Sequence, residues 1–172
     1  MKRALLSDQV PNLLILQYSD DWLVKNLLLV PSFFFSDAAI QKRPPLASTA
    51  RRAGWVGCNI VLSKIADEGK IRLVVNEYAV PAEAVRAAYN RVRRIARLPV
   101  RLRGWTLDVL RLIRGIGSAE FDLNQVYSFE GELSSLHPNN LNIRPKIRQQ
   151  LQVLRDLGFV QFLGRGTYVL KS

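Results

Sequence analysis

Residue types that build metal centres, disulfides and nucleophilic dyads are scarce in this chain of 172 residues, which has one cysteine, Cys58, and one histidine, His137. A single cysteine excludes an internal disulfide, and the two residues together cannot supply the four ligands of a structural zinc site. Glycine-rich phosphate loops of either common spacing are absent as well. These absences predict no metal site in this chain and favour a reducing compartment.

Long apolar runs are also missing. Residues 1–12 (MKRALLSDQVPN) lack the apolar stretch of a signal peptide, and residues 27–35, interrupted by Pro31, are too short to span a bilayer. We therefore expect a cytoplasmic protein with no membrane partner.

Acidic residues are few compared with basic ones. The chain has 14 acidic and 25 basic side chains and a formal net charge of +11, whereas its apolar fraction of 48% is ordinary for a globular protein. Such an excess indicates a polyanionic partner, most commonly nucleic acid. The arginine-rich segment 95–105 (IARLPVRLRGW) predicts a boundary between a core at 1–102 and a second domain at 103–172.

The first part has the patterns of a mixed α/β core. Residues 12–17 (NLLILQ) and 26–30 (NLLLV) predict strands buried on both faces of a sheet, and residues 71–75 (IRLVV) predict a third strand. Residues 81–98 have a helical period, with an apolar stripe formed by Val85, Tyr89, Val92 and Ala96. Four arginines lie largely off that stripe: Arg86, Arg93, Arg94 and Arg97. They fit either contact with a phosphate backbone or plain solvation, and the small apolar side chains disfavour membrane docking.

The second part predicts a winged helix, which consists of three helices followed by a hairpin. Thr106 is placed to cap the first helix, and Asp122 with Gln125 has the spacing of a capping box for the second. Pro145 suits the first turn of the third helix, at residues 146–157. Residues 159–163 and 167–170 then predict two short strands joined by Gly164-Arg165-Gly166.

The third predicted helix has two different faces. Its apolar face consists of Ile147, Leu151 and Leu154, with Gln150 and Leu157 at the edge. The other face contains the candidate DNA-reading residues Arg148, Gln149, Gln152 and Arg155, with Lys146 at the start of the helix. Arginine can bond both guanine acceptors and glutamine can bond the adenine donor-acceptor pair. An isolated helix with this face is most often simply solvated, but the third position in a winged helix favours base reading. Arg165, at the wing tip, is either a phosphate contact or a turn residue.

Residues 42–60 form a long predicted connection that contains Arg51, Arg52 and Trp55. Connections of this length inside a compact domain are usually functional. The indole fits stacking on a base while the arginines hold phosphates, but it equally fits a core position.

Only one segment resembles the carboxylate and lysine pattern of metal-dependent nucleases. Glu68-Gly69-Lys70 has the spacing of that element, with Asp20 or Asp21 upstream. Asp67-Glu68-Gly69 nevertheless has the composition of a turn before a strand, where the two side chains would not share a cleft. Cys58 and His137 lie in different predicted domains. We therefore predict no catalytic residue in this chain.

Several long blocks of this chain resemble the DpnI-like type II restriction endonucleases, also called Dam-replacing proteins. They are residues 33–60 (FFFSDAAIQKRPPLASTARRAGWVGCNI), 103–110 (RGWTLDVL), 126–133 (VYSFEGEL), 146–156 (KIRQQLQVLRD) and 162–170 (FLGRGTYVL). The resemblance implies a nuclease core of the PD-(D/E)XK type followed by a winged helix, and cleavage at GATC sites whose adenine is methylated. It also implies that the third helix reads one such site and that Arg51, Arg52 and Trp55 belong to the reading surface of the core.

The resemblance covers the C-terminal two-thirds of that family. In the family, the catalytic aspartate and Glu-x-Lys pair, which use Mg²⁺, and a zinc-binding cysteine cluster lie further toward the N-terminus. The chain is therefore expected to be a DNA-binding portion that is catalytically incomplete, with the N-terminal fragment as a partner. The first half is expected to expose apolar edges, whereas the winged helix needs no partner. The alternative is a stand-alone winged-helix transcriptional regulator with an α/β sensing domain.

Overall fold

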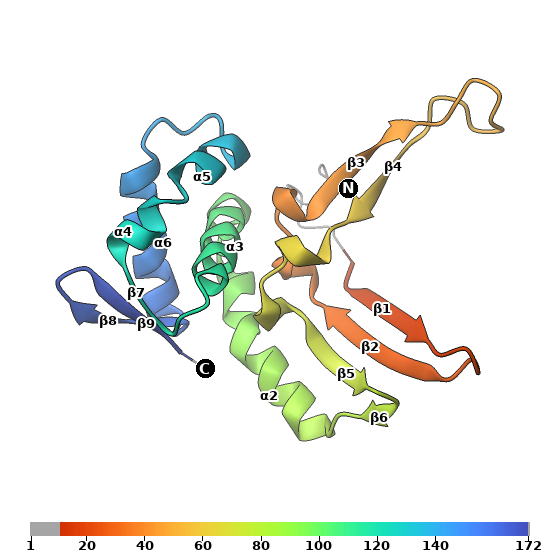
Figure 1. Cartoon of the computed structure of the whole chain (residues 1–172), viewed down its shortest axis with the longest axis horizontal. Coiled ribbons are helices and arrows are strands. Elements are labelled where there is room, and N and C mark those ends of the chain that lie inside the picture. Colours follow the sequence, from red (N-terminus) through yellow and green to blue (C-terminus); the bar gives the residue numbers. More distant parts are fainter. Residues whose placement is uncertain (1–10, 172) are drawn as a thin grey trace.

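A central helix, α3 (Val100–Gly115), separates two groups of elements in the computed structural model, which describes residues 11–171. In Figure 1 a four-stranded sheet and a projecting arm lie to the right of α3, and short helices with a small sheet lie to its left. The predicted fold class is confirmed, because a mixed α/β part is followed by a winged helix. None of the helices in residues 11–171 is both long and apolar enough to cross a membrane.

The larger sheet is antiparallel throughout. Its strands, in spatial order, are β1 (Leu13–Tyr18), β2 (Val24–Val30), β5 (Ile71–Val75) and β6 (Tyr78–Ala79). β1 and β2 form a hairpin, and β2 also pairs with β5. All three predicted strands are therefore present, and the third has the predicted bounds.

The predicted burial of the first two strands on both faces is wrong. β1 lies at the edge of the sheet, and Leu14 and Leu16 are 60% and 41% exposed. β2 is paired on both sides but is also only partly buried, because an antiparallel sheet commonly packs one face on the core and leaves the other in solvent. The apolar edge that the resemblance implied is observed.

The turn before β5 confirms the turn predicted at Asp67-Glu68-Gly69. Asp67–Gly69 forms a short 3₁₀ turn, and the strand begins two residues later. Gly69 is buried, and a Cβ at this position would overlap the ring of Phe34, which is itself almost fully buried. Glycine is required here because the backbone approaches an aromatic ring so closely.

The predicted helix at 81–98 is an α-helix followed by a tighter turn. α2 (Ala82–Val92) is continued by a 3₁₀ segment at Arg93–Arg97. Because a 3₁₀ segment repeats every three residues, Ile95 rather than the predicted Ala96 enters the core. The four arginines predicted to lie off the apolar stripe are exposed.

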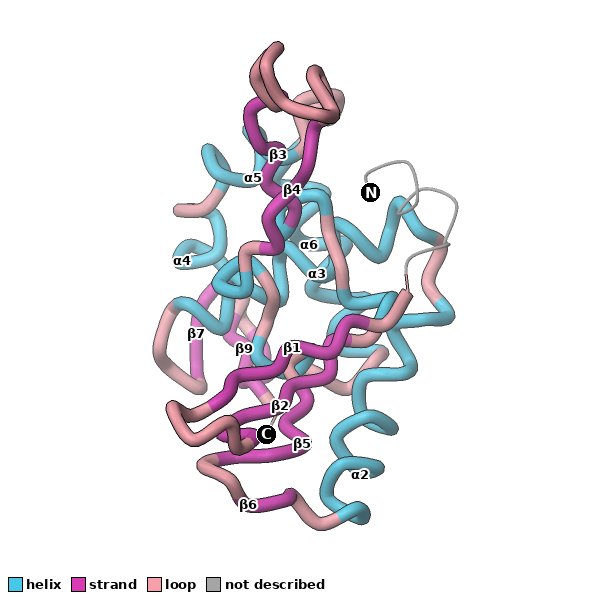
Figure 2. The backbone as a smooth tube through the Cα atoms, turned by 90° about the vertical axis from the view of Figure 1, so that its right-hand side faces the viewer, coloured by secondary structure: helices cyan, strands magenta, loops and turns pink. Residues whose placement is uncertain are grey.

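A two-stranded arm replaces the long connection predicted at residues 42–60. β3 (Ile40–Pro45) and β4 (Val56–Ile60) pair in antiparallel fashion, with Ile40 opposite Ile60. The arm stands clear of the other elements in Figure 1, and its tip projects beyond them in Figure 2. The prolines that end β3 hid it from pattern reading, because proline cannot donate a ladder hydrogen bond.

The C-terminal elements follow the order of a winged helix. After α3 come β7 (Glu120–Asp122), α4 (Leu123–Tyr127), α5 (Glu130–Leu136), α6 (Ile143–Asp156), β8 (Val160–Gly164) and β9 (Thr167–Leu170). β9 pairs with both β7 and β8, so the predicted hairpin gains a third strand that patterning missed. Gly164, Arg165 and Gly166 form the tip of the wing.

Two helix boundaries differ from the prediction. The first helix begins at Val100, and Thr106 is not its cap: it is buried in mid-helix, with its hydroxyl 2.9 Å from the Leu102 carbonyl oxygen. The arginine-rich start concealed this first turn, although arginine is as good a helix former as leucine. The capping box of Asp122 and Gln125 is confirmed, but the helix that it opens is divided into α4 and α5.

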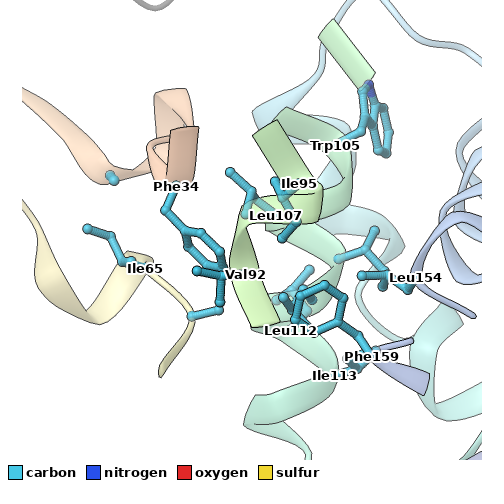
Figure 3. Close-up of a cluster of buried hydrophobic side chains, with 14 of the residues drawn as sticks. Phe34, Ile65, Val92, Ile95, Trp105, Leu107, Leu112, Ile113, Leu154 and Phe159 are labelled. Carbon is cyan, nitrogen blue, oxygen red and sulfur yellow. The ribbon is translucent and has the colours of Figure 1, made fainter. Parts of the chain in front are cut away.

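One hydrophobic core extends to both sides of α3 (Figure 3). It includes Phe34, Ile65 and Ile95 from the first half and Leu154 and Phe159 from the winged helix. Nine residues of α3 are buried. The first half therefore covers part of the first helix of the winged helix, and whether the winged helix is self-sufficient stays a prediction.

Candidate nucleic-acid interface

Helix α6 buries one face and exposes the other, as its spacing predicts. Ile147, Leu151 and Leu154 are completely buried against the rest of the winged helix. Arg148, Gln149, Gln152 and Arg155 are all exposed. The apolar stripe thus fixes the rotation of α6 about its axis, and this rotation presents the four polar side chains to solvent.

Neighbouring side chains hold both arginines of this face. Arg148 Nη1 donates to the Tyr127 hydroxyl at 2.8 Å, and Arg155 Nε donates to Asp156 Oδ1 at 3.0 Å. Tyr127 comes from α4, so the position of Arg148 depends on two helices. An arginine restrained in this way loses less side-chain entropy when it binds.

Lys146 and Gln150 have more internal positions than the sequence predicted. Lys146 is half-buried, with Nζ 5.8 Å from the centre of the Trp105 ring, and it donates to Gln149 Oε1 at 2.7 Å. Gln150, predicted at the edge of the apolar face, is fully buried and accepts a hydrogen bond from the Thr106 hydroxyl at 2.8 Å. Helical spacing alone could not find this partner, because Thr106 lies 44 positions away.

The wing presents one cation at its tip. Arg165 is exposed and has a φ of +48°, between Gly164 and Gly166, which also have positive φ. Behind the tip, the Tyr168 ring stacks on Phe121 with centroids 5.6 Å apart. Burial raises the pKa of the Tyr168 hydroxyl above its ordinary value, so this residue stays neutral at physiological pH.

The arm carries the second predicted set of residues. Arg51 and Arg52 are exposed in the connection between β3 and β4, and Trp55 is 54% exposed. A Cβ on Gly57 would come within 2.9 Å of Trp55 Cζ3, so the indole lies over this glycine. The alternative that Trp55 fills the core is therefore wrong.

A polar seam along α3, formed by Asp108, Arg111 and Arg114, joins the two halves, and sequence reasoning did not find it. Asp108 is buried and accepts hydrogen bonds from the Ser36 hydroxyl at 2.7 Å and His137 Nε2 at 2.9 Å. His137 in turn stacks on Trp105, with centroids 3.8 Å apart. The spacing of three residues between Asp108, Arg111 and Arg114 was visible in the sequence, but the side chains that they contact come from distant segments.

The other two members of the polar seam add further links between the halves, Arg111 through Glu132 and Arg114 directly. Arg111 pairs with Glu132 at 2.7 Å, and Lys64 from the first half pairs with the same carboxylate at 3.2 Å. Arg114 pairs with Glu68 and donates to the Lys171 carbonyl oxygen at 3.0 Å. The relative position of the two halves is thus held by polar contacts as well as by the core.

Glu132 makes one of these contacts dependent on pH. The hydrogen bond from Arg111, together with Lys64, lowers the pKa of the Glu132 carboxyl below its ordinary value of 4.5. A lowered pKa stabilises the folded protein above the unfolded pKa, and this contribution is lost as the pH falls through the folded value. We expect stability to fall more steeply in the parent than in Glu132→Gln as the pH drops below about 4.5. Urea denaturation at several pH values checks this, and parallel profiles would contradict it.

In the nuclease-like segment, neighbouring side chains pair with both charged groups. Glu68 is bound to Arg114, and Lys70 Nζ lies 2.7 Å from Asp67 Oδ1. Asp20 and Asp21 belong to the turn before β2, whereas Glu68 precedes Ile71, which pairs with Leu29 near the other end of β2. Within residues 11–171, no group of three or more His, Cys, Asp or Glu side chains is placed to hold a metal ion.

Comparison with known families agrees with this architecture. A family model described as the Dam-replacing family matches residues 1–98, which is more than half of the chain. The chain belongs to the Dam-replacing family. A second model, the Dam-replacing HTH domain, matches residues 101–169 and so covers the winged helix from α3 to β9.

The match to the Dam-replacing HTH domain places α6 and its exposed polar face within a DNA-binding domain. A helix-turn-helix domain is a DNA-binding module. The second helix of its two-helix motif, which is the third helix of a winged helix, enters the major groove. The chain is therefore a DNA-binding protein related to the DpnI-like restriction enzymes. The separate roles of Lys146, Arg148, Gln149, Gln152, Arg155, Arg165, Arg51, Arg52 and Trp55 stay predictions.

Proposed function

We propose that this chain binds double-stranded DNA at GATC sites whose adenine carries a methyl group, with α6 in the major groove. The observation that carries the proposal is the exposed face of α6 in a Dam-replacing HTH domain. Arginine and glutamine side chains match the hydrogen-bonding edges of guanine and of the adenine-thymine pair, the two kinds of base pair in GATC. The family resemblance supplies the methylated site.

The wing has the role of a backbone contact in this proposal. Arg165 lies at the tip of the exposed hairpin formed by β8 and β9, which follows the proposed DNA-reading helix α6 in the chain. Unlike α6, this hairpin has no polar face. A single cation in such a position suits a phosphate, which orients the protein on the duplex without reading its sequence.

The arm is the second proposed DNA contact. It carries two exposed arginines and a half-exposed indole on a ribbon that stands clear of the other elements (Figure 1). Its formal charge is positive throughout, since Lys42, Arg43, Arg51 and Arg52 are its only charged residues. This combination suits phosphate contact beside an aromatic contact to bases.

Replacing Trp55 with alanine is expected to weaken DNA binding without lowering the stability of the fold. Because the indole lies outside the core, the midpoint of thermal unfolding should stay within about 2 °C of the parent. DNA affinity should fall roughly tenfold, since loss of an aromatic contact to a base has about that effect. Calorimetry and fluorescence anisotropy measure the two quantities. A large loss of stability without loss of affinity would contradict the proposed role of the arm.

We further propose that this chain does not cut DNA by itself. The support is the arrangement around Glu68 and Lys70, whose charged groups are engaged by Arg114 and Asp67 in a turn rather than placed together in a cleft. Incubation of methylated plasmid with the protein and Mg²⁺ should leave the plasmid intact. Cleavage that disappears in Lys70→Ala would overturn this part of the proposal.

The binding proposal is tested by comparing three duplexes of equal length. One carries methylated GATC, one carries unmethylated GATC and one has a scrambled site. At a fixed salt concentration, the methylated duplex should bind at least tenfold more tightly than the other two, because one good base contact discriminates by about that factor or more. Equal affinity for all three duplexes would overturn the assigned target.

A further inference from the structure

The two glutamines on the reading face of α6 differ in the hydrogen bonds that they already make. Gln149 Oε1 accepts a hydrogen bond from Lys146 Nζ at 2.7 Å and lies 3.5 Å from Gln150 Nε2. For Gln152, which is also exposed, the described residues supply no side-chain hydrogen bond. One glutamine therefore has its amide orientation set by the protein, and the other is free to rotate.

The orientation of Gln149 follows from the chemistry of its partners. A lysine ammonium group only donates hydrogen bonds, so the atom that faces Lys146 must be the amide oxygen. Gln150 Nε2 lies 3.5 Å from the same oxygen, at the limit of hydrogen-bond distance, so the orientation of Gln149 rests on Lys146. The Gln149 oxygen thus faces Lys146, which occupies one of its two lone pairs, and the NH₂ group on the other branch of the amide is turned away from Lys146.

The residues that hold Gln149 are themselves anchored in the fold. Gln150 is completely buried, and Lys146 is half-buried beside the Trp105 ring, 5.8 Å from its centre. Trp105 and Thr106 both belong to α3, the helix that is buried between the two halves. The first helix of the winged helix therefore sets the hydrogen-bonding character of the reading helix.

We propose that Gln149 is a specificity-determining residue that presents its NH₂ group, and so a donor, to a base edge. This inference rests on the proposed placement of α6 in the major groove. In this orientation the side chain suits the guanine acceptors or the thymine carbonyl, whereas the paired donor and acceptor contact with adenine needs the oxygen that Lys146 holds.

This restriction favours methylated DNA. In a paired N-methylated adenine, the one hydrogen left on the exocyclic amine bonds to thymine, and the methyl group occupies the major-groove position of the other hydrogen. A glutamine oxygen finds a donor there only in unmethylated adenine. By engaging the Gln149 oxygen, Lys146 removes an interaction that would favour the unmethylated site.

The test releases the Gln149 oxygen and measures the ratio of the two affinities. Lys146→Met keeps the apolar stem near Trp105 and removes the donor. Affinity for the unmethylated GATC duplex should rise roughly tenfold relative to the methylated duplex, because the freed amide gains a contact with adenine. Lys25→Met, an exposed position on β2, removes the same charge and should leave the ratio unchanged.

A double-mutant cycle shows whether the change acts through Gln149. In the Gln149→Met background, Lys146→Met should no longer alter the ratio, because no amide remains to be released. An unchanged ratio in the Lys146→Met single variant, or the same shift with and without Gln149, would overturn the inference. If the parent protein prefers methylated DNA but Lys146→Met does not change the affinity ratio, the proposed function stands and the inference about Gln149 fails. If the parent binds no DNA, both fail.

Discussion

Replacing Ile113 with alanine is expected to lower the free energy of unfolding by about 2–5 kcal/mol, the range for removing a large buried aliphatic side chain. Ile113 is completely buried in α3, in the same core that includes Phe34 from the first half and Leu154 from α6. Because one core extends to both sides of α3, the variant should still unfold in a single transition, at a temperature lowered by at least several degrees.

The measurement is calorimetry or urea denaturation followed by two probes. Far-ultraviolet circular dichroism reports mainly on the helices, and tryptophan fluorescence includes Trp105 at the junction and Trp55 on the arm. Leu141→Ala is the control, because this leucine is 93% exposed and its loss should change stability by no more than about 0.5 kcal/mol. Two separate transitions in the parent would show that the winged helix folds independently and would contradict the shared core.

Replacing Arg148 with alanine is expected to reduce discrimination among DNA sequences. A bidentate arginine contact to guanine is worth about 1–3 kcal/mol against a wrong base. Affinity for the methylated GATC duplex should therefore fall by roughly tenfold or more, while affinity for the scrambled duplex changes far less. The hydrogen bond to Tyr127 at 2.8 Å holds the guanidinium in place before DNA arrives.

Arg165→Ala provides the matched comparison, because it removes the same side chain from the wing instead of the reading helix. If Arg165 contacts a phosphate, its loss weakens binding to all duplexes alike. It also reduces the slope of log affinity against log salt concentration by about one. Titrations of the methylated and scrambled duplexes at several salt concentrations separate the two effects. Identical behaviour of the two variants would contradict the assignment of α6 as the reading helix.

Local patterns predicted most of the winged helix. The capping box at Asp122 depends on residues three apart, and the apolar face of α6 depends on residues three and four apart, so neighbouring positions carry the information. The third strand of the small sheet was missed, since three residues are too few for an alternating pattern and β7 exists only through its pairing with β9.

The candidate site was predictable in its exposed residues and not in the contacts that hold them. Spacing alone placed Arg148, Gln149, Gln152 and Arg155 on one exposed face. It could not indicate that Lys146 would contact Trp105, or that Gln150 would be buried against Thr106, because these partners are distant in the chain. The exposure of Trp55 was also undecided, because the ribbon that carries it forms through pairing between β3 and β4.

By itself, the sequence determined the winged helix, the exposed polar face of its third helix and the strongly basic character of the chain. These properties depend on short-range periodicity and on composition, which no distant contact alters. The tertiary structure decided the rest. It buried α3 between the two halves, raised the arm clear of the core and turned the Gln149 oxygen toward Lys146. These features arise from contacts between segments far apart in the chain, which local spacing cannot specify.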